Sequence, residues 1–196
     1  MTAATATPTT DRSSRLIRIG LSLLVALAIV FSAWWIAGRN GLNELGSGGM
    51  NASLLPSVGE VAPDFTVVDL NGRPRSLSEF AGQPVWINFW GSWCPPCRAE
   101  MPDLQMAYEE LQRQGVVMLA ISLDEPAVDA ARFANLNHLT FTILSDPTRE
   151  GTSANYPIFS FPTHIFINPD GTVEVIALKE LNVETALEYG ARILDG

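Results

Sequence analysis

The spacing of apolar residues predicts alternating strands and helices over most of the chain from residue 58 onward. Short apolar runs rich in β-branched and aromatic residues predict strands, and apolar residues three or four apart predict helices. The predicted strands cover residues 65–69, 85–89, 116–123, 141–144, 164–168 and 172–178. A capping-box pattern at Ser76 and Glu79 marks a short helix start, and longer helices are predicted at 95–114, 126–136 and 183–194.

The order of these elements predicts a fold class. Turn sequences at 71–72 and 169–171 place one hairpin before, and another after, a central strand–helix–strand–helix–strand segment. Two consecutive β-α-β units require parallel strands joined by right-handed crossovers, whereas the hairpins add antiparallel strands. We therefore expect an α/β three-layer sandwich with a mixed central sheet and helices on both faces.

A second apolar pattern lies near the N-terminus. Residues 19–38 contain no charged side chain, and a helix of that length spans about 30 Å, the thickness of the hydrocarbon core of a bilayer. Three arginines precede the segment and Arg39 follows it, which favours a cytoplasmic N-terminus. We expect a cytoplasmic segment at 1–18, a single-pass membrane anchor at 19–38, a flexible Gly-rich linker at 39–57 and an extracytoplasmic domain at 58–196.

Two alternatives to an anchor remain open for residues 19–38. A cleaved signal peptide has a shorter apolar region, about 7–15 residues, that ends at a site of small residues. Here Trp34 and Trp35 interrupt the small residues near the end of the run, and they suit the aromatic belt of a membrane boundary. The other alternative is a buried helix of the domain core. An anchor and a signal peptide both place the domain outside the cytoplasm.

The charge balance excludes several classes of function. The chain of 196 residues carries 12 Lys and Arg against 21 Asp and Glu, a formal charge of −9, and Lys179 is its only lysine. Nucleic acid is therefore not an expected partner, because its recognition needs clustered basic residues. Two cysteines are too few for a disulfide-scaffold protein, and no phosphate-binding Gly-rich loop pattern occurs.

The strongest chemical signal is Cys94-Pro95-Pro96-Cys97, placed where a predicted strand gives way to a helix. The first turn of a helix presents unpaired N–H groups and a partial positive charge, which stabilise a thiolate. Cys94 is therefore the expected nucleophile. Cys97 lies one turn later, where it can resolve a mixed disulfide, and the two prolines stiffen the turn between them.

Three other uses of the cysteine pair are disfavoured. A stabilising disulfide across four residues contributes about 2 kcal/mol in the chain-entropy model, less than a long loop would. A metal site needs further ligands, and the only histidines, His138 and His164, lie 26 residues apart. Covalent haem attachment requires a histidine where this chain has Arg98. We therefore expect a redox dithiol that works without a metal ion or another cofactor.

Residues 88–102, which read NFWGSWCPPCRAEMP, resemble the thioredoxin family, and in particular its membrane-anchored TlpA/ResA/CcmG (DsbE) branch of thiol-disulfide oxidoreductases. Further matches to this branch occur in the expected order at residues 62–65 (APDF), 161–163 (FPT) and 168–171 (NPDG). The resemblance covers the chain from about Val58 to the C-terminus, and it implies a thioredoxin-like fold for residues 58–196.

The resemblance implies roles for the residues around the dithiol. Pro162 matches the family's cis-proline, so the Phe161-Pro162 bond is expected to be cis and these residues to contact substrate. Trp93 matches the aromatic residue beside the nucleophile, and Pro95 and Pro96 belong to the same substrate-facing turn. The alternatives are an ordinary trans proline at position 162 and a core tryptophan at position 93.

The resemblance also implies a proton acceptor. Thioredoxins proper have a buried aspartate where this chain has Asn88, and an amide cannot accept a proton. Glu100, one turn after Cys97, matches the acid that the ResA-like branch uses near its dithiol, where a buried carboxylate would oppose thiolate formation. The alternative is a solvated surface position for Glu100, and Glu60 is a weaker candidate for the same role.

The chain departs from the branch at two positions. Ser160 stands where a glycine is common, and His164 replaces a frequent threonine. His164 could titrate near the site, bind a partner or pack at the start of a strand. Peroxidase chemistry is disfavoured because peroxiredoxins use T-x-x-C, and the first position of that pattern is Gly91.

These observations predict a membrane-anchored thiol-disulfide oxidoreductase that reduces disulfides in exported proteins. The branch resemblance implies apocytochrome c as a substrate, in cytochrome c maturation, and a membrane thiol-transfer protein of the DsbD/CcdA type as electron donor. Two alternatives stay open at this point. One is a thiol oxidant or isomerase in protein folding, and the other is a non-enzymatic copper chaperone that binds through Cys94, Cys97 and His164.

Overall fold

The computed structural model describes residues 19–28, 31–32 and 55–194. The chain divides into two units, the first at residues 1–49 and the second at residues 50–196. Residues 19–28 and 31–32 are helical. Within the described ranges, no helix is both long enough and apolar enough to cross a membrane. The predicted segment 1–18, part of the predicted anchor and most of the predicted linker lie outside those ranges, so the anchor stays a prediction.

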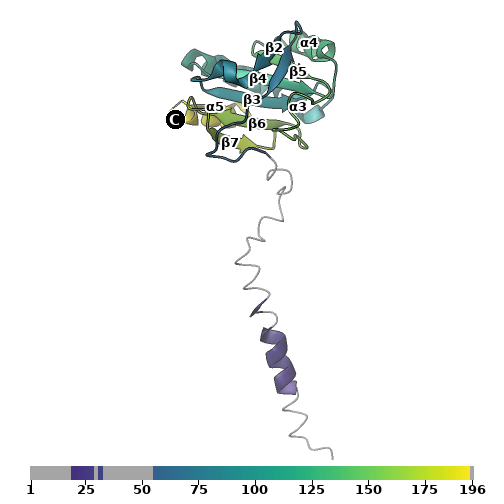
Figure 1. The fold of residues 1–196 in the computed structure, drawn as a ribbon, viewed down its shortest axis with the longest axis vertical. Helices are drawn as coiled ribbons and strands as arrows, with labels where there is room; N and C mark the ends of the chain where they lie inside the picture. Colours follow the sequence, from purple (N-terminus) through teal and green to yellow (C-terminus); the bar gives the residue numbers. More distant parts are fainter. Residues whose placement is uncertain (1–18, 29–30, 33–54, 195–196) are drawn as a thin grey trace, which may run out of the picture. The chain divides into compact units, whose positions relative to one another are not determined.

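The second unit is built on a seven-stranded mixed sheet with the order β2-β1-β5-β4-β3-β6-β7 (Figure 1). Its strands are β1 (Thr66–Asp69), β2 (Pro74–Ser76), β3 (Val85–Trp90), β4 (Val117–Leu123), β5 (Thr142–Asp146), β6 (Thr163–Ile167) and β7 (Val173–Ala177). Strands β3, β4 and β5 pair in parallel, and all the other pairings are antiparallel. The predicted strands, hairpins and mixed sheet are therefore confirmed.

The helices also begin and end near their predicted positions. They are η2 (Leu77–Phe80), α3 (Pro95–Leu111) with its 3-10 extension η3 (Gln112–Gln114), α4 (Ala127–Leu136) and α5 (Val183–Arg192). Gly115 ends the α3–η3 segment in the left-handed conformation, with φ of 97°, which glycine adopts without strain. The capping interaction at η2 is present, since the Glu79 carboxylate accepts the Ser76 N–H at 2.7 Å.

The two faces of the sheet differ from the expected arrangement. Successive side chains of β3 alternate between two apolar clusters, with Trp86 and Trp90 in one and Ile87 and Phe89 in the other. Helices α3, α4 and α5 all contribute to the first cluster, whereas the second is covered by η2 and by an irregular segment that includes Tyr156. The sequence predicts helices on both faces, but all three long helices of this unit lie on the first face, and among the described residues the second face has only the short 3-10 helix η2. The reason is topological: strands β3, β4 and β5 follow one another in the same direction, so two right-handed crossovers place α3 and α4 on the same side.

An ion pair ties the end of β4 to the irregular segment between β5 and β6. The Arg149 Nε donates to Asp124 Oδ1 at 2.7 Å, a second guanidinium nitrogen bonds the other carboxylate oxygen, and a third donates to the Ile158 carbonyl. Arg149 Cζ also lies 5.4 Å from the ring centroid of Phe161. This arginine therefore holds together the chain segment that leads into β6.

We expect this pair to make stability depend on pH. Hydrogen bonds from Arg149 lower the pKa of Asp124 from its usual 3.8, so the carboxylate favours the folded state. That contribution is complete well above pH 3.8 and is lost as the pH falls through the lowered folded-state pKa. In urea unfolding measured from pH 7 to pH 3, Asp124→Asn should lower stability at pH 7 and lose less on acidification than the parent. Asp129→Asn, on the surface of α4, is the control, and identical pH slopes for Asp124→Asn and the parent would contradict the assignment.

Candidate active site

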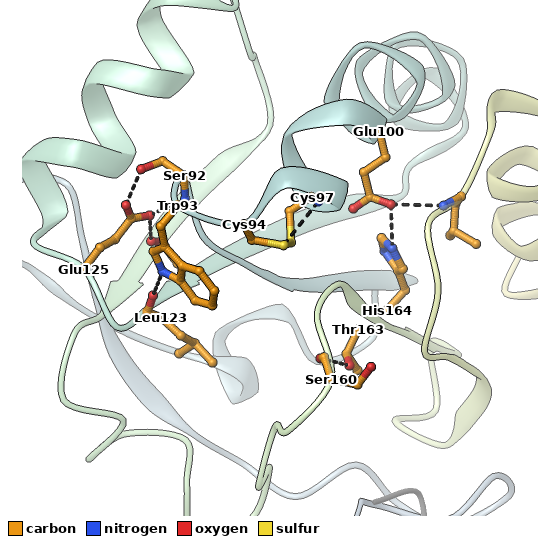
Figure 2. The surroundings of a disulfide bond; sticks show 12 residues. Ser92, Trp93, Cys94, Cys97, Glu100, Leu123, Glu125, Ser160, Thr163 and His164 are labelled. Carbon is orange, nitrogen blue, oxygen red and sulfur yellow. Dashed lines mark hydrogen bonds and ion pairs between the residues drawn. A yellow bond between two sulfur atoms is a disulfide. The ribbon is translucent and has the colours of Figure 1, made fainter. Parts of the chain in front are cut away.

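The cysteine pair lies where β3 ends and α3 begins, as the sequence predicts. Cys94 is the N-cap residue of α3, and its Sγ accepts the Cys97 backbone N–H at 3.3 Å. The two residues form a disulfide with a Cα–Cα distance of 5.3 Å, and both are almost completely buried in this state. Figure 2 shows the disulfide at the start of the helix, between Trp93 on one side and Glu100 on the other.

The prolines between the cysteines decide which backbone group faces the Cys94 sulfur. Pro95 and Pro96 occupy the first two helical positions and carry no N–H, so the first backbone donor of α3 is the Cys97 N–H. That donor is the one that points at Cys94 Sγ. When the disulfide is reduced, the helix N-terminus and this N–H stabilise a thiolate at Cys94.

Trp93 is an exposed residue beside the dithiol and not a core tryptophan. Its side chain is 47% exposed, its Nε1 donates to the Leu123 carbonyl at 3.0 Å, and its ring meets that of Phe161 edge to face at 5.1 Å between centroids. The Phe161-Pro162 bond is cis, as expected, and Pro162 is buried. The Phe161 contact with Trp93 thus brings the segment before β6 next to the cysteine pair.

A buried carboxylate that the sequence analysis missed holds the loop in front of Cys94. Glu125 is 6% exposed and accepts hydrogen bonds from the Ser92 backbone N–H at 2.8 Å and from the hydroxyls of Ser92 and Ser122 (Figure 2). Ser92 and Glu125 are 33 residues apart in sequence and meet because β3 and β4 are neighbours. Nothing near either residue in the sequence predicts this contact, except that an acidic residue follows a buried strand.

Glu100 is buried, so its surface alternative is wrong. It is 3% exposed, and its Oε2 accepts the Leu181 N–H at 3.0 Å and contacts His164 Nε2 at 3.1 Å. Its Oε1 has no hydrogen-bond partner among the described residues. Glu100 also borders a polar cavity of about 290 Å³, formed between α3 and the segment that leads into α5. Among the lining residues, Lys179 and Glu180 are exposed.

His164 is fully buried in β6, and both of its ring nitrogens have partners. Nδ1 accepts from the Trp86 indole N–H at 3.3 Å, and Nε2 contacts Glu100. The copper-chaperone alternative would require His164 to give up one of these contacts. Within the described part of the chain, no group of three or more His, Cys, Asp or Glu side chains could hold a metal ion.

The remaining candidates have smaller parts in this geometry. Asn88 is fully buried on β3, directly opposite His164 in the register, and neither atom of its amide has a hydrogen-bond partner among the described residues. Ser160 accepts the Thr163 hydroxyl at its carbonyl, at 2.8 Å. Glu60 is exposed, and its backbone carbonyl pairs with the Val173 N–H at the start of β7, so the structure gives it no place beside the dithiol.

The mixed sheet places a Cys-Pro-Pro-Cys disulfide at the N-terminus of α3 and a cis-proline segment beside it. This arrangement defines a thioredoxin-like thiol-disulfide oxidoreductase. Residues 58–176 match the AhpC/TSA family, and the chain belongs to it. Its relatives include the thiol-disulfide oxidoreductase ResA of Geobacillus thermodenitrificans, 40% identical over 133 residues, or 68% of this chain and 76% of that protein. ResA of Bacillus subtilis is 30% identical over 159 residues, 80% of each chain.

Solved structures agree with this class. A secreted thiol-disulfide isomerase from Corynebacterium glutamicum superposes with a TM-score of 0.63 and 30% identity, over 69% of this chain and 86% of that one. A secreted Mycobacterium tuberculosis disulfide oxidoreductase, described as homologous to Escherichia coli DsbE, gives a TM-score of 0.60 and 25% identity, over 65% of this chain and 95% of that one. Enzymes of this class use their cysteine pair itself as the redox centre.

The position of Trp93 depends on the glycine two residues before it. A Cβ added at Gly91 would lie 2.4 Å from Trp93 Nε1, so Gly91→Ala must displace the indole and break its bond to Leu123. We expect the KM for a protein disulfide to rise about fivefold, as the loss of one hydrogen bond of about 1 kcal/mol implies. The Trp93 indole N–H resonance, assigned with Trp93→Phe, should shift.

Reduction of a small aromatic disulfide is the control for the Gly91→Ala variant. Such a substrate does not need the exposed indole, so its rate constant should match that of the parent. An unchanged KM for the protein disulfide together with an unchanged Trp93 resonance would contradict the steric argument.

Proposed function

We propose that this protein is a membrane-anchored reductant of disulfides in exported proteins, with Cys94 as nucleophile and Cys97 as resolving thiol. The observation that carries the proposal is the geometry of the pair: Cys94 caps α3 and accepts the Cys97 N–H, whereas Cys97 is fully buried one turn later. Only the first sulfur lies at the helix N-terminus, so it is the one that the helix stabilises as a thiolate.

The reaction transfers two electrons to the substrate. The Cys94 thiolate attacks one sulfur of the substrate disulfide, forms a mixed disulfide and releases the first substrate thiolate. Cys97 then loses its proton and attacks Cys94 Sγ, which releases the second substrate thiolate and leaves the Cys94–Cys97 disulfide. The substrate takes up two protons, one that Cys97 gave up and one from solvent. A dithiol donor must then reduce the enzyme for the next cycle.

Glu100 is the proposed acceptor of the Cys97 proton. The two residues are one turn apart on the same buried face of α3, and Glu100 keeps one carboxylate oxygen without a partner. Asn88, on the strand beneath, has no acidic proton and no basic group to offer. A carboxylate beside the buried thiol supplies the base that the resolving step requires.

The surface around Trp93 suits an extended protein segment. A groove of about 500 Å³ beside the dithiol combines apolar side chains, Trp93, Phe133 and Leu136 among them, with the acidic Asp129. The cis-proline segment at Phe161 and Pro162 lies against Trp93. Substrate backbone pairing along that segment would place a disulfide over Cys94, with Pro95 and Pro96 as further contacts.

The reducing direction and the partners rest on the branch resemblance, and the relatives' names support the assignment to that branch. Relatives are named ResA, and a structural neighbour is described as homologous to DsbE. We therefore propose apocytochrome c, or other exported thiol proteins, as substrate and a membrane thiol-transfer protein of the DsbD/CcdA type as donor. The second candidate is a thiol oxidant or isomerase, and the name of the Corynebacterium glutamicum structure, a secreted thiol-disulfide isomerase, supports the isomerase.

Replacement of each cysteine should separate the two chemical steps. In a dithiol-coupled insulin reduction assay, Cys94→Ser should fall to the uncatalysed rate because the attacking sulfur is lost. Cys97→Ser should still attack and should accumulate the mixed disulfide, which mass spectrometry detects. His138→Asn, on the surface, should behave like the parent.

The direction of transfer is checked by the midpoint potential of the dithiol. A value near about −270 mV supports a reductant, whereas a value near about −120 mV would favour the oxidant alternative. Full activity in Cys94→Ser would overturn the proposal as a whole.

Anchoring is proposed from the uncharged segment at residues 19–38 and the arginines that precede it. The full chain, expressed in bacteria, should sediment with membranes, resist alkaline extraction and retain its original N-terminal region by mass spectrometry. Its reduced cysteines should react with a membrane-impermeant thiol reagent applied from outside the inner membrane. A new N-terminus after Ala33 or Ala37 would refute the anchor in favour of a cleaved signal peptide.

A further inference from the structure

A chain of three polar side chains crosses the apolar core beneath α3. The Trp86 indole N–H lies 3.3 Å from His164 Nδ1, and His164 Nε2 lies 3.1 Å from Glu100 Oε2. The exposed fraction is 0% for Trp86 and His164 and 3% for Glu100. Figure 2 shows the imidazole below the carboxylate, pointing up from β6 toward α3.

The tautomer of His164 follows from the hydrogen-bonding groups around it. The Trp86 indole nitrogen can only donate, so Nδ1 must be the unprotonated nitrogen of the imidazole. A neutral imidazole has one N–H, which therefore lies on Nε2 and points at Glu100. A proton on Nδ1 would place an N–H of His164 directly against the indole N–H of Trp86, with no acceptor between them. Trp86 thus fixes His164 as a hydrogen-bond donor to the carboxylate.

This donor decides how the Glu100 carboxylate is used. Oε2 receives two N–H groups, from His164 and from Leu181, which anchor it on the side away from the cysteines. Oε1 is left without a partner among the described residues, and Figure 2 shows it on the side of Cys97. Oε2 is thus occupied by two donors, whereas Oε1 is the carboxylate oxygen that can still accept a proton.

We infer that His164 is a positioning residue for proton transfer from Cys97. Held by Trp86 as the Nε2–H tautomer, it anchors Glu100 Oε2 and leaves Oε1 directed at the resolving thiol. This inference rests on the proposed function, in which Glu100 accepts that proton. It assigns a role to a histidine that replaces the threonine frequent in the resembling branch.

Few other titratable groups surround this carboxylate. Cys97 and Asp103 lie on α3, His164 lies on β6, and Lys179 and Glu180 lie in the segment before α5. Lys179 and Glu180 are exposed, so solvent screens them. Asn88, on β3, does not titrate. A change confined to the His164 N–H is therefore expected to show in the pH dependence of the step that uses Glu100.

Two substitutions at His164 test its polar contacts. His164→Leu removes both contacts, whereas the amide of His164→Gln can donate an N–H to Glu100 and can accept from the Trp86 indole. The difference between the two variants therefore reports the polar contacts of position 164 apart from the loss of the imidazole ring. His138→Asn, at the only other histidine, is the surface control.

The measurement is the rate at which Cys97 resolves a preformed Cys94 mixed disulfide, followed from pH 5 to pH 9. We expect the pH profile of His164→Leu to move upward by about one pH unit, the size of one hydrogen bond to a charged group. His164→Gln should return most of the way to the parent profile. The rate of the first attack by Cys94 should stay within about twofold of the parent in both variants.

The possible outcomes separate the inference from the proposed function. If the parent resolves the mixed disulfide and His164→Leu follows the same pH profile, the role of His164 is overturned while the enzyme assignment stands. If Glu100→Gln also retains the parent profile, Glu100 is not the acceptor and the inference fails with it. A parent without reductase activity would instead overturn the proposed function.

Should His164→Leu fail to fold, nitrogen-15 NMR of the imidazole in the parent protein provides an independent test. The spectrum distinguishes the two neutral tautomers. The Nε2–H tautomer at pH 7 supports the inference, and the Nδ1–H tautomer would overturn it.

Discussion

The hydrogen bond from the Cys97 N–H to Cys94 Sγ joins the chemistry of the site to the fold. It exists because only four residues separate β3, buried at the centre of the sheet, from the start of α3, so the helix N-terminus lies directly above the end of the strand. Two prolines at the start of α3 remove the competing donors and leave this N–H as the first one available. A shift of the helix start by one residue would direct the dipole and the donor away from the sulfur.

The rest of the site is arranged on either side of that junction. Glu125, Ser92 and the carbonyl of Leu123 hold the approach to Cys94 and the indole of Trp93, and they rely on the parallel pairing of β3 with β4. Glu100 and His164 lie on the other side, where β6 pairs with β3 in the antiparallel sense. The central strand thus separates the exposed surface around Trp93 from the buried carboxylate of Glu100. Each depends on strand neighbours that are distant in sequence.

This division explains which features the sequence could predict. The hairpins, the β-α-β units, the position of the cysteine pair and the cis bond at Pro162 follow from local patterns or from a specific resemblance. The distribution of the helices over the two faces of the sheet does not follow from local patterns, because it depends on the order of the strands in the sheet. The burial of Glu100 depends on residues around Leu181, which close over it, and the ion pair of Asp124 with Arg149 joins positions 25 residues apart. Contacts of this kind have no periodicity in the chain.

The polar cavity beside Glu100 has a consequence for how the enzyme works while a partner is bound. It opens between α3 and the segment before α5, and none of its lining residues borders the groove at Trp93. A protein docked over the dithiol would therefore cover the groove at Trp93 and leave the cavity beside Glu100 open to solvent. Glu100 would then remain in exchange with bulk water while the two electrons pass to the docked protein, so proton transfer would not depend on the covered face.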